Sequence, residues 1–96
     1  MSTRLQVPAV APWDEPWVRT LMITKPMFIT LYDAADRGAG QVRSIYPGGQ
    51  WRFIRAGLYR RGLIELDGRL TMCGHVAAIW AAHAVRRYWP AGVPTS

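Results

Sequence analysis

Basic, amide and aromatic side chains lie close together between residues 50 and 61, at spacings that suit one face of a helix. Arg52, Arg55 and Tyr59 recur at intervals of three and four residues, so a helix over this segment places them on the same side. Guanidinium groups form bidentate contacts with phosphates and with guanine edges. Ala56 lies at the centre of this stripe, and so small a residue lets the helix approach the floor of a groove. The pattern therefore indicates nucleic-acid binding, and its alternative interpretation is a solvated basic face.

Four further residues are candidates for the same interface. Gln50, at the start of the predicted helix, has the amide that pairs with adenine, or is simply a polar residue at a helix N-terminus. Arg43 precedes this helix and is a candidate for a clamp on the phosphate backbone. Arg60 lies at the end of the helix, where the helix dipole alone also favours a cation. Arg69 follows a predicted turn, from which it can reach a phosphate or a minor groove.

The distribution of charge favours a polyanionic partner. The 96 residues carry a formal charge of +6, and eleven of the twelve basic residues are arginine. Codon bias in a GC-rich genome produces the same bulk composition. Residues 37–69, however, hold seven arginines against two acids, and a localised surplus of charge indicates a polyanion better than a diffuse one.

Cysteine usage and hydropathy predict a soluble cytoplasmic protein. Cys73 is the only cysteine, so no intramolecular disulfide can form and a reducing compartment is expected. The N-terminus lacks the charged and then apolar pattern of a signal peptide. No apolar run is long enough to cross a bilayer, so we expect no membrane association.

The titratable and nucleophilic side chains form no catalytic or metal-binding pattern. His75 and His83 are eight residues apart, about 12 Å along a helix axis, so one tetrahedral ion cannot bind both. Cys73 has no nucleophile signature around it, and the glycines lack the pattern of a phosphate-binding loop. We therefore expect no enzymatic activity, no bound metal and no cofactor.

Hydrophobic periodicity predicts three helices. The first begins with Thr24 as its N-cap and runs to about residue 37. The second covers about residues 50–61, and the third covers about residues 74–89 and is apolar on most sides. The apolar residues that define the inner faces of the first two helices are Phe28, Leu31, Tyr32 and Ala35, and Trp51, Ile54 and Leu58.

The remaining segments divide the chain into an arm, one domain and a tail. Residues 1–16 contain three prolines and are expected to form an extended arm. Residues 17–89 form the predicted domain, and residues 90–96 a flexible tail. Within the domain, residues 17–24 suit either a short strand or the lead-in to a helix. Residues 41–46 have apolar side chains three apart, which indicates one or two helical turns.

A glycine and an Asp-Gly pair predict a β-hairpin after the second helix. Gly62 is expected to end that helix. Residues 63–66 and 69–72 then flank Asp67-Gly68, the dipeptide that suits a two-residue type I′ turn. The predicted fold is therefore α+β but mostly helical, with one short two-stranded hairpin.

A string of residues after position 57 has a characteristic order. A leucine is followed by polar residues, a glycine and an aliphatic pair, then by a turn and a Leu-Thr-x-x-Gly start to a further helix. These residues are Leu58 to Ile64, Asp67 to Thr71, Gly74, and Ala77 with Ala78. Over about residues 48–82, this pattern resembles the C-terminal half of bacterial and phage winged helix-turn-helix DNA-binding proteins. The resemblance implies a small domain with a recognition helix at 50–61, a hairpin wing and a C-terminal helix.

The resemblance and the basic stripe together predict a DNA-binding protein, a small transcriptional regulator of bacterial or phage origin. Helix 50–61 would enter the major groove of double-stranded DNA, and the apolar last helix would support a homodimer. The alternative is a protein-binding module on the same fold, docking on a host or structural partner. An RNA-associated protein is a third interpretation, because a basic surface with aromatics also suits RNA.

Five tryptophans bear on the protein-binding alternative. Trp51 and Trp80 are expected in the core. Trp13, Trp17 and Trp89 lie near the ends of the chain and are candidates for exposure. Aromatic side chains at the surface are enriched at protein interfaces, so exposed tryptophans would serve as anchors for a partner.

Overall fold

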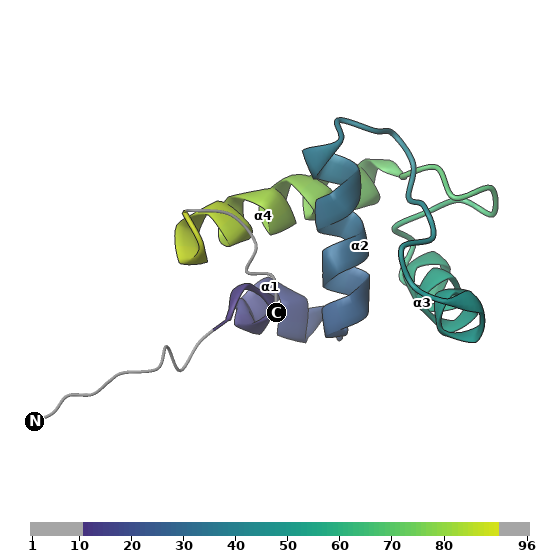
Figure 1. Ribbon diagram of the computed structural model, residues 1–96, viewed down its shortest axis with the longest axis horizontal. Coiled ribbons are helices and arrows are strands. Elements are labelled where there is room, and N and C mark those ends of the chain that lie inside the picture. The colour runs from purple at the N-terminus through teal and green to yellow at the C-terminus, as the bar shows by residue number, and fades with distance from the viewer. Residues whose placement is uncertain (1–10, 91–96) are drawn as a thin grey trace, which may run out of the picture.

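The computed structural model describes residues 11–90, which fold into a cluster of short helices (Figure 1). In chain order the elements are the 3₁₀ helix η1 (Pro12–Asp14), α1 (Pro16–Thr20), α2 (Lys25–Asp36), α3 (Gly48–Arg60) and α4 (Met72–Tyr88). The broadest contact between elements joins α2 and α4, which cross in Figure 1. In the same view α1 and α3 lie on opposite sides of α2.

Small residues on α4 let it pack closely with α2. The buried residues of α4 are mostly alanines, and Ala81 is completely inaccessible. They share one core with Phe28 and Leu31 of α2, which are also completely buried. Large side chains on one helix and small ones on the other fill the space between them at the density typical of protein interiors.

Two threonine caps set where α2 and α4 begin. Thr24 accepts a hydrogen bond from the N–H of Met27 at 3.4 Å, so α2 begins where the sequence predicted. Thr71 accepts from the N–H of Gly74 at 3.0 Å, and its own hydroxyl donates to the carbonyl of Gly62 at 2.6 Å. Because Thr71 is the cap, α4 begins two residues earlier than predicted.

Three helices end in the same way, with a left-handed residue just past the last turn. These residues are Met22 after α1 (φ 56°), Gly38 after α2 (φ 64°) and Gly62 after α3 (φ 72°). In each case the N–H of the following residue bonds back to the carbonyl five positions earlier, which is the Schellman arrangement. The predicted glycine stop of the helix 50–61 is therefore confirmed, and the helix itself runs from Gly48 to Arg60.

The predicted β-hairpin wing is wrong. Within the described residues no strand forms, and the segment after α3 contains only isolated antiparallel bridges, Ile64 with Leu70 and Gln41 with Arg69. The turn closes from the N–H of Gly68 to the carbonyl of Glu65 at 3.0 Å, so its central residues are Leu66 and Asp67, one residue earlier than in the predicted Asp-Gly turn. Too few residues then remain before the cap of α4 to pair as strands. The fold of residues 11–90 is mostly helical without a sheet, rather than an α+β winged domain.

The helical turns predicted at residues 41–46 are also absent. Val42 is buried, but its N–H bonds to the carbonyl of Gly68 at 3.0 Å, and the segment is irregular. Pro47 follows directly, and a proline disfavours helical backbone at the residue before it. Residues 41–46 therefore form an irregular segment, the strap, which connects α2 to α3 and crosses the turn at residues 65–68.

The predicted arm and tail fall mostly outside the described residues, as positions 1–10 and 91–96. The part of the arm that is described is helical from Pro12, in η1 and at the start of α1, rather than extended. Residues 17–24, which the sequence left open, are helical as far as Thr20.

Four of the five tryptophans differ from the prediction, whereas Trp51 packs against the core as expected. Trp13 and Trp17 pack against the core, with ring centroids 6.2 and 6.0 Å from that of Phe28, and Trp89 stacks edge-on against Trp13 at 5.2 Å. Trp80, predicted in the core, is 48% exposed. Periodicity fails here because α4 is apolar on most sides, so its pattern does not show which side is buried.

Candidate nucleic-acid interface

The buried side of α3 fixes which residues it presents to solvent. Ile54 and Leu58 are buried in the core. Gly57 faces α2 so closely that a Cβ atom there would collide with the methyl group of Met27. On the opposite side Arg52, Ala56 and Tyr59 are exposed, and Arg55 is half-buried on one flank. These four residues are the predicted stripe.

The two ends of α3 add further exposed side chains. Gln50 is exposed in the first turn and Arg60 in the last. Phe53, with 75% of its surface exposed, shares with Arg60 the flank away from Arg55. Phe53 was not among the predicted contacts, because its position in the helical repeat does not by itself distinguish exposure from partial burial.

Five arginines form ion pairs with carboxylates at distances of 2.8–3.6 Å. These arginines are Arg19, Arg37, Arg43, Arg69 and Arg87, and their partners are Asp14, Asp33, Asp67 and Glu15. Two of the five, Arg43 and Arg69, are among the predicted contacts to nucleic acid.

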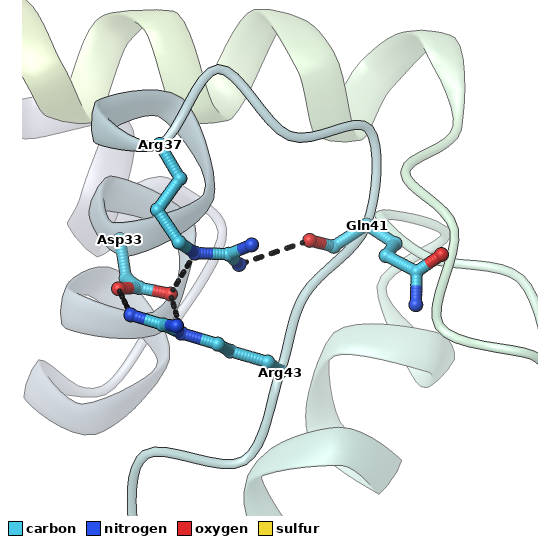
Figure 2. Close-up of polar contacts among 4 residues, drawn as sticks. All are labelled: Asp33, Arg37, Gln41 and Arg43. Atoms are coloured by element: carbon cyan, nitrogen blue, oxygen red, sulfur yellow. Dashed lines mark hydrogen bonds and ion pairs between the residues drawn. The ribbon is translucent and has the colours of Figure 1, made fainter.

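Arg43 forms a bidentate ion pair with Asp33 (Figure 2). Its Nε and Nη2 donate to the two carboxylate oxygens at 3.1 and 3.0 Å. Arg37 donates to the same carboxylate at 2.9 Å and also to the carbonyl of Gln41 at 3.2 Å. Arg43 thus holds the strap against α2, and its guanidinium already has an anionic partner. It does not join the outer face of α3.

Arg69 is paired within its own turn. Its Nε donates to Asp67 at 2.8 Å, and its backbone N–H donates to the same carboxylate at 3.1 Å. The backbone hydrogen bond is the main reason that the pKa of Asp67 is lowered, so this carboxylate stays charged. The charge of Arg69 is therefore partly offset, although its side chain remains exposed.

Arg61, next to the predicted stripe, is a structural residue. Its guanidinium donates to the carbonyls of Leu21 and Met22 at 2.8 and 2.7 Å and to that of Gly57 at 2.8 Å. These bonds join the end of α3 to the turn after α1. That turn includes Met22, whose left-handed backbone is unfavourable for a residue with a side chain.

Three arginines on α3 have no ion pair with any carboxylate of residues 11–90. They are Arg52, Arg55 and Arg60. Within the same range, Arg86 on α4 and Arg61 also lack one, although Arg61 donates to three carbonyls. Five of the ten arginines of residues 11–90 are thus paired with a carboxylate, and the largest group without such a partner lies on α3.

A groove of about 540 Å³ runs between α3 and the turn that follows it. Its walls are Trp51, Arg52, Arg55, Ala56, Tyr59, Glu65 and Leu66. Three of these residues, Trp51, Glu65 and Leu66, were not among the predicted contacts. The last two were expected in a strand, so nothing in the pattern indicated that a turn would bring them beside α3.

The described residues contain no group of three or more histidine, cysteine, aspartate or glutamate side chains arranged to hold a metal ion. Cys73 is a free, exposed thiol at the start of α4. Among residues 11–90, no helix is both long enough and apolar enough to cross a membrane.

No protein-family model, curated protein or solved structure matches this chain. The likeness to winged helix-turn-helix proteins therefore depends on the short residue pattern alone, and the fold lacks the wing that the likeness implied. The function must be inferred from the exposed side chains and their charges.

Proposed function

We propose that this protein binds double-stranded DNA through the outer face of α3 and acts as a small transcriptional regulator. The observation that carries the proposal is the set of uncompensated arginines, Arg52, Arg55 and Arg60, on an exposed helix. Guanidinium groups without an internal partner are free to release counterions from a phosphate backbone and to form forked contacts with it. The role is binding alone, without catalysis or a cofactor.

The arrangement of α3 suits a helix lying in the major groove. Ala56 lies between Arg52 and Tyr59 on the exposed side, so the helix backbone can come close to the base edges. Arg52 and Arg55 then reach guanine edges or phosphates, and the hydroxyl of Tyr59 reaches a phosphate. Gln50 in the first turn is placed to contact adenine.

Arg43 and Arg69 have a smaller part in the proposal. Each guanidinium must share or leave its carboxylate, Asp33 or Asp67, before it can contact a phosphate. We therefore assign them to the edge of the interface.

Fluorescence anisotropy tests the proposal, with the protein's own upstream DNA and a scrambled duplex of equal length at about 50 and 200 mM salt. A regulator should prefer its site by at least ~1,000-fold. Replacing both Arg52 and Arg55 with alanine should weaken binding at least ~30-fold, because each contact contributes about 1–3 kcal/mol. The matched control replaces Arg19 and Arg87, which removes the same charge from α1 and α4 instead of α3. Equal losses in the two double variants would contradict the assignment of α3.

A second candidate partner is another copy of the chain, on the outer face of α4. Met72, Val76, Ile79 and Trp80 are exposed there, and Met72 is 81% accessible. In an antiparallel pair of α4 helices centred between residues 77 and 78, Val76 of each copy lies opposite Ile79 of the other. The apolar stripe is thus complementary to itself.

The charges near the ends of α4 also favour an antiparallel homodimer. In a parallel pair of α4 helices the two Arg86 side chains would lie close together. In an antiparallel pair each Arg86 lies just past the N-terminal end of the other copy's α4. Glu65 lies in the turn before that start, is exposed, and has no ion pair among residues 11–90.

A cytoplasmic location suits the proposal, because the exposed thiol of Cys73 would remain reduced there.

A further inference from the structure

The groove between α3 and the turn at residues 65–68 is lined by aromatic, apolar and charged side chains, which together suit one ligand. Trp51 and Tyr59 supply aromatic surface, and Ala56 and Leu66 supply apolar surface. We propose that this groove accepts a single unpaired nucleobase of a bound DNA strand. The inference rests on the proposed function, since it requires that nucleic acid binds α3.

The size and lining of the groove suit a planar aromatic group. Its volume of about 540 Å³ lies within the range of small-molecule sites, roughly 300–1,000 Å³. Tyr59 and Leu66 are exposed, at 48% and 68%, so their surfaces are available to a ligand without rearrangement of the core. Stacking of a base on an aromatic side chain contributes about 1–3 kcal/mol and tolerates any base.

The charges around the groove favour a nucleotide over an acidic peptide. Arg52 and Arg55 line it and have no ion pair among the described residues, so they can hold the phosphates on either side of the base. Glu65 lines the same groove and would repel any anion placed inside it, so the phosphates must lie beside the arginines while the uncharged base enters the groove. A carboxylate can, however, accept a hydrogen bond from the exocyclic amino group of cytosine.

An unpaired base is required because the groove would contact the face of the base. In a duplex the faces are stacked on neighbouring bases, and a protein reaches only the edges. A bulged or extruded base exposes its face at a modest energetic cost. Because Arg52, Arg55, Ala56 and Tyr59 of the exposed face of α3 also line the groove, it predicts tighter binding to DNA that has an extrahelical base at the helix contact itself.

The test compares three labelled DNAs of one sequence by fluorescence anisotropy: a perfect duplex, a duplex with one bulged cytosine, and a duplex with an abasic bulge at the same position. The abasic bulge reproduces the flexibility of the bulge without its base. We expect the cytosine bulge to bind about 5- to 100-fold more tightly than the abasic bulge. Leu66→Ala and Tyr59→Ala should each reduce this preference. Phe53→Ala should leave it unchanged, because Phe53 is an exposed side chain of α3 outside the groove.

Each outcome separates this inference from the proposed function. Equal binding of the cytosine and abasic bulges overturns the inference, as does a preference that survives both Leu66→Ala and Tyr59→Ala. If the perfect duplex still binds and depends on Arg52 and Arg55, the proposed function stands without the base site. Absence of binding to all three DNAs at about 50 mM salt overturns both. Circular dichroism of each variant shows that it is folded.

Discussion

At the scale of single residues, an arginine's role depends on whether a carboxylate or a carbonyl lies within reach. Arg60 and Arg61 are neighbours in sequence and carry the same charge. Arg60 is exposed and without an ion pair in the described structure, whereas Arg61 donates to three carbonyls. Adjacent residues of one type therefore have different predicted effects on stability and on binding.

Alanine substitutions at these two positions should separate stability from binding. Arg61→Ala removes hydrogen bonds from a charged donor and should lower the free energy of unfolding by about 1–3 kcal/mol. Arg60→Ala should leave stability within about 0.5 kcal/mol and weaken DNA binding. Urea unfolding followed by tryptophan fluorescence measures the first effect, and anisotropy the second. A variant Arg61→Ala as stable as the parent would show that the bonds to the turn after α1 contribute nothing.

At the scale of elements, a close backbone contact explains why a glycine occupies position 74. Gly74 lies in the first turn of α4 against the backbone of Leu63, and a Cβ atom would collide with that residue's carbonyl oxygen. Gly49, in the first turn of α3, has no atom within 4 Å of such a Cβ. The two glycines should therefore respond to alanine with opposite signs.

Gly74→Ala should lower the free energy of unfolding by about 1–3 kcal/mol, because overpacking against backbone forces α4 away from Leu63. Gly49→Ala should raise it by up to about 1 kcal/mol, because alanine loses less conformational freedom in a helix. Thermal and urea unfolding of both variants measures the pair. A Gly74→Ala protein as stable as the parent would refute the close contact between α4 and Leu63.

The elements also show how far the sequence determines the fold. The helix of α2 could be predicted because its cap, its first-turn proline and its apolar stripe all agree. The β-hairpin was predicted wrongly, because the predicted turn centred on Asp67 and Gly68 does not form. Leu66 and Asp67 lie inside a turn from Glu65 to Gly68, and Thr71 starts a helix.

The candidate site was predictable to a similar degree. The exposed stripe of α3 follows from helical spacing, since Ile54 and Leu58 fix the buried side. The ion pairs of Arg43 and Arg69 were not predictable, because Asp33 is ten residues from Arg43 and the Asp67 pair depends on a turn that was assigned differently. Contacts between distant or misassigned segments leave no periodic signal.

At the scale of the whole molecule, the uncompensated arginines lie mainly on α3, whereas exposed apolar residues form a stripe along α4. A homodimer through α4 predicts that Ile79→Glu abolishes self-association, because each interface would then bury a charge without a partner. Sedimentation equilibrium measures the change, and Phe53→Glu is the matched control, since it adds the same charge to an exposed apolar site on α3. A parent protein that stays monomeric while α4 captures a host protein would favour the protein-binding alternative.

The most direct test of the central claim is the salt dependence of DNA binding. The logarithm of the binding constant falls linearly with the logarithm of salt concentration, with a slope near −0.9 for each phosphate contacted. If Arg52 and Arg55 each contact a phosphate, replacing both with alanine should reduce the steepness of the slope by about 2. Replacing Arg19 and Arg87 should leave the slope unchanged. An α3 variant that keeps both the affinity and the slope of the parent, or an equal change in both variants, would contradict the claim that α3 is the nucleic-acid interface.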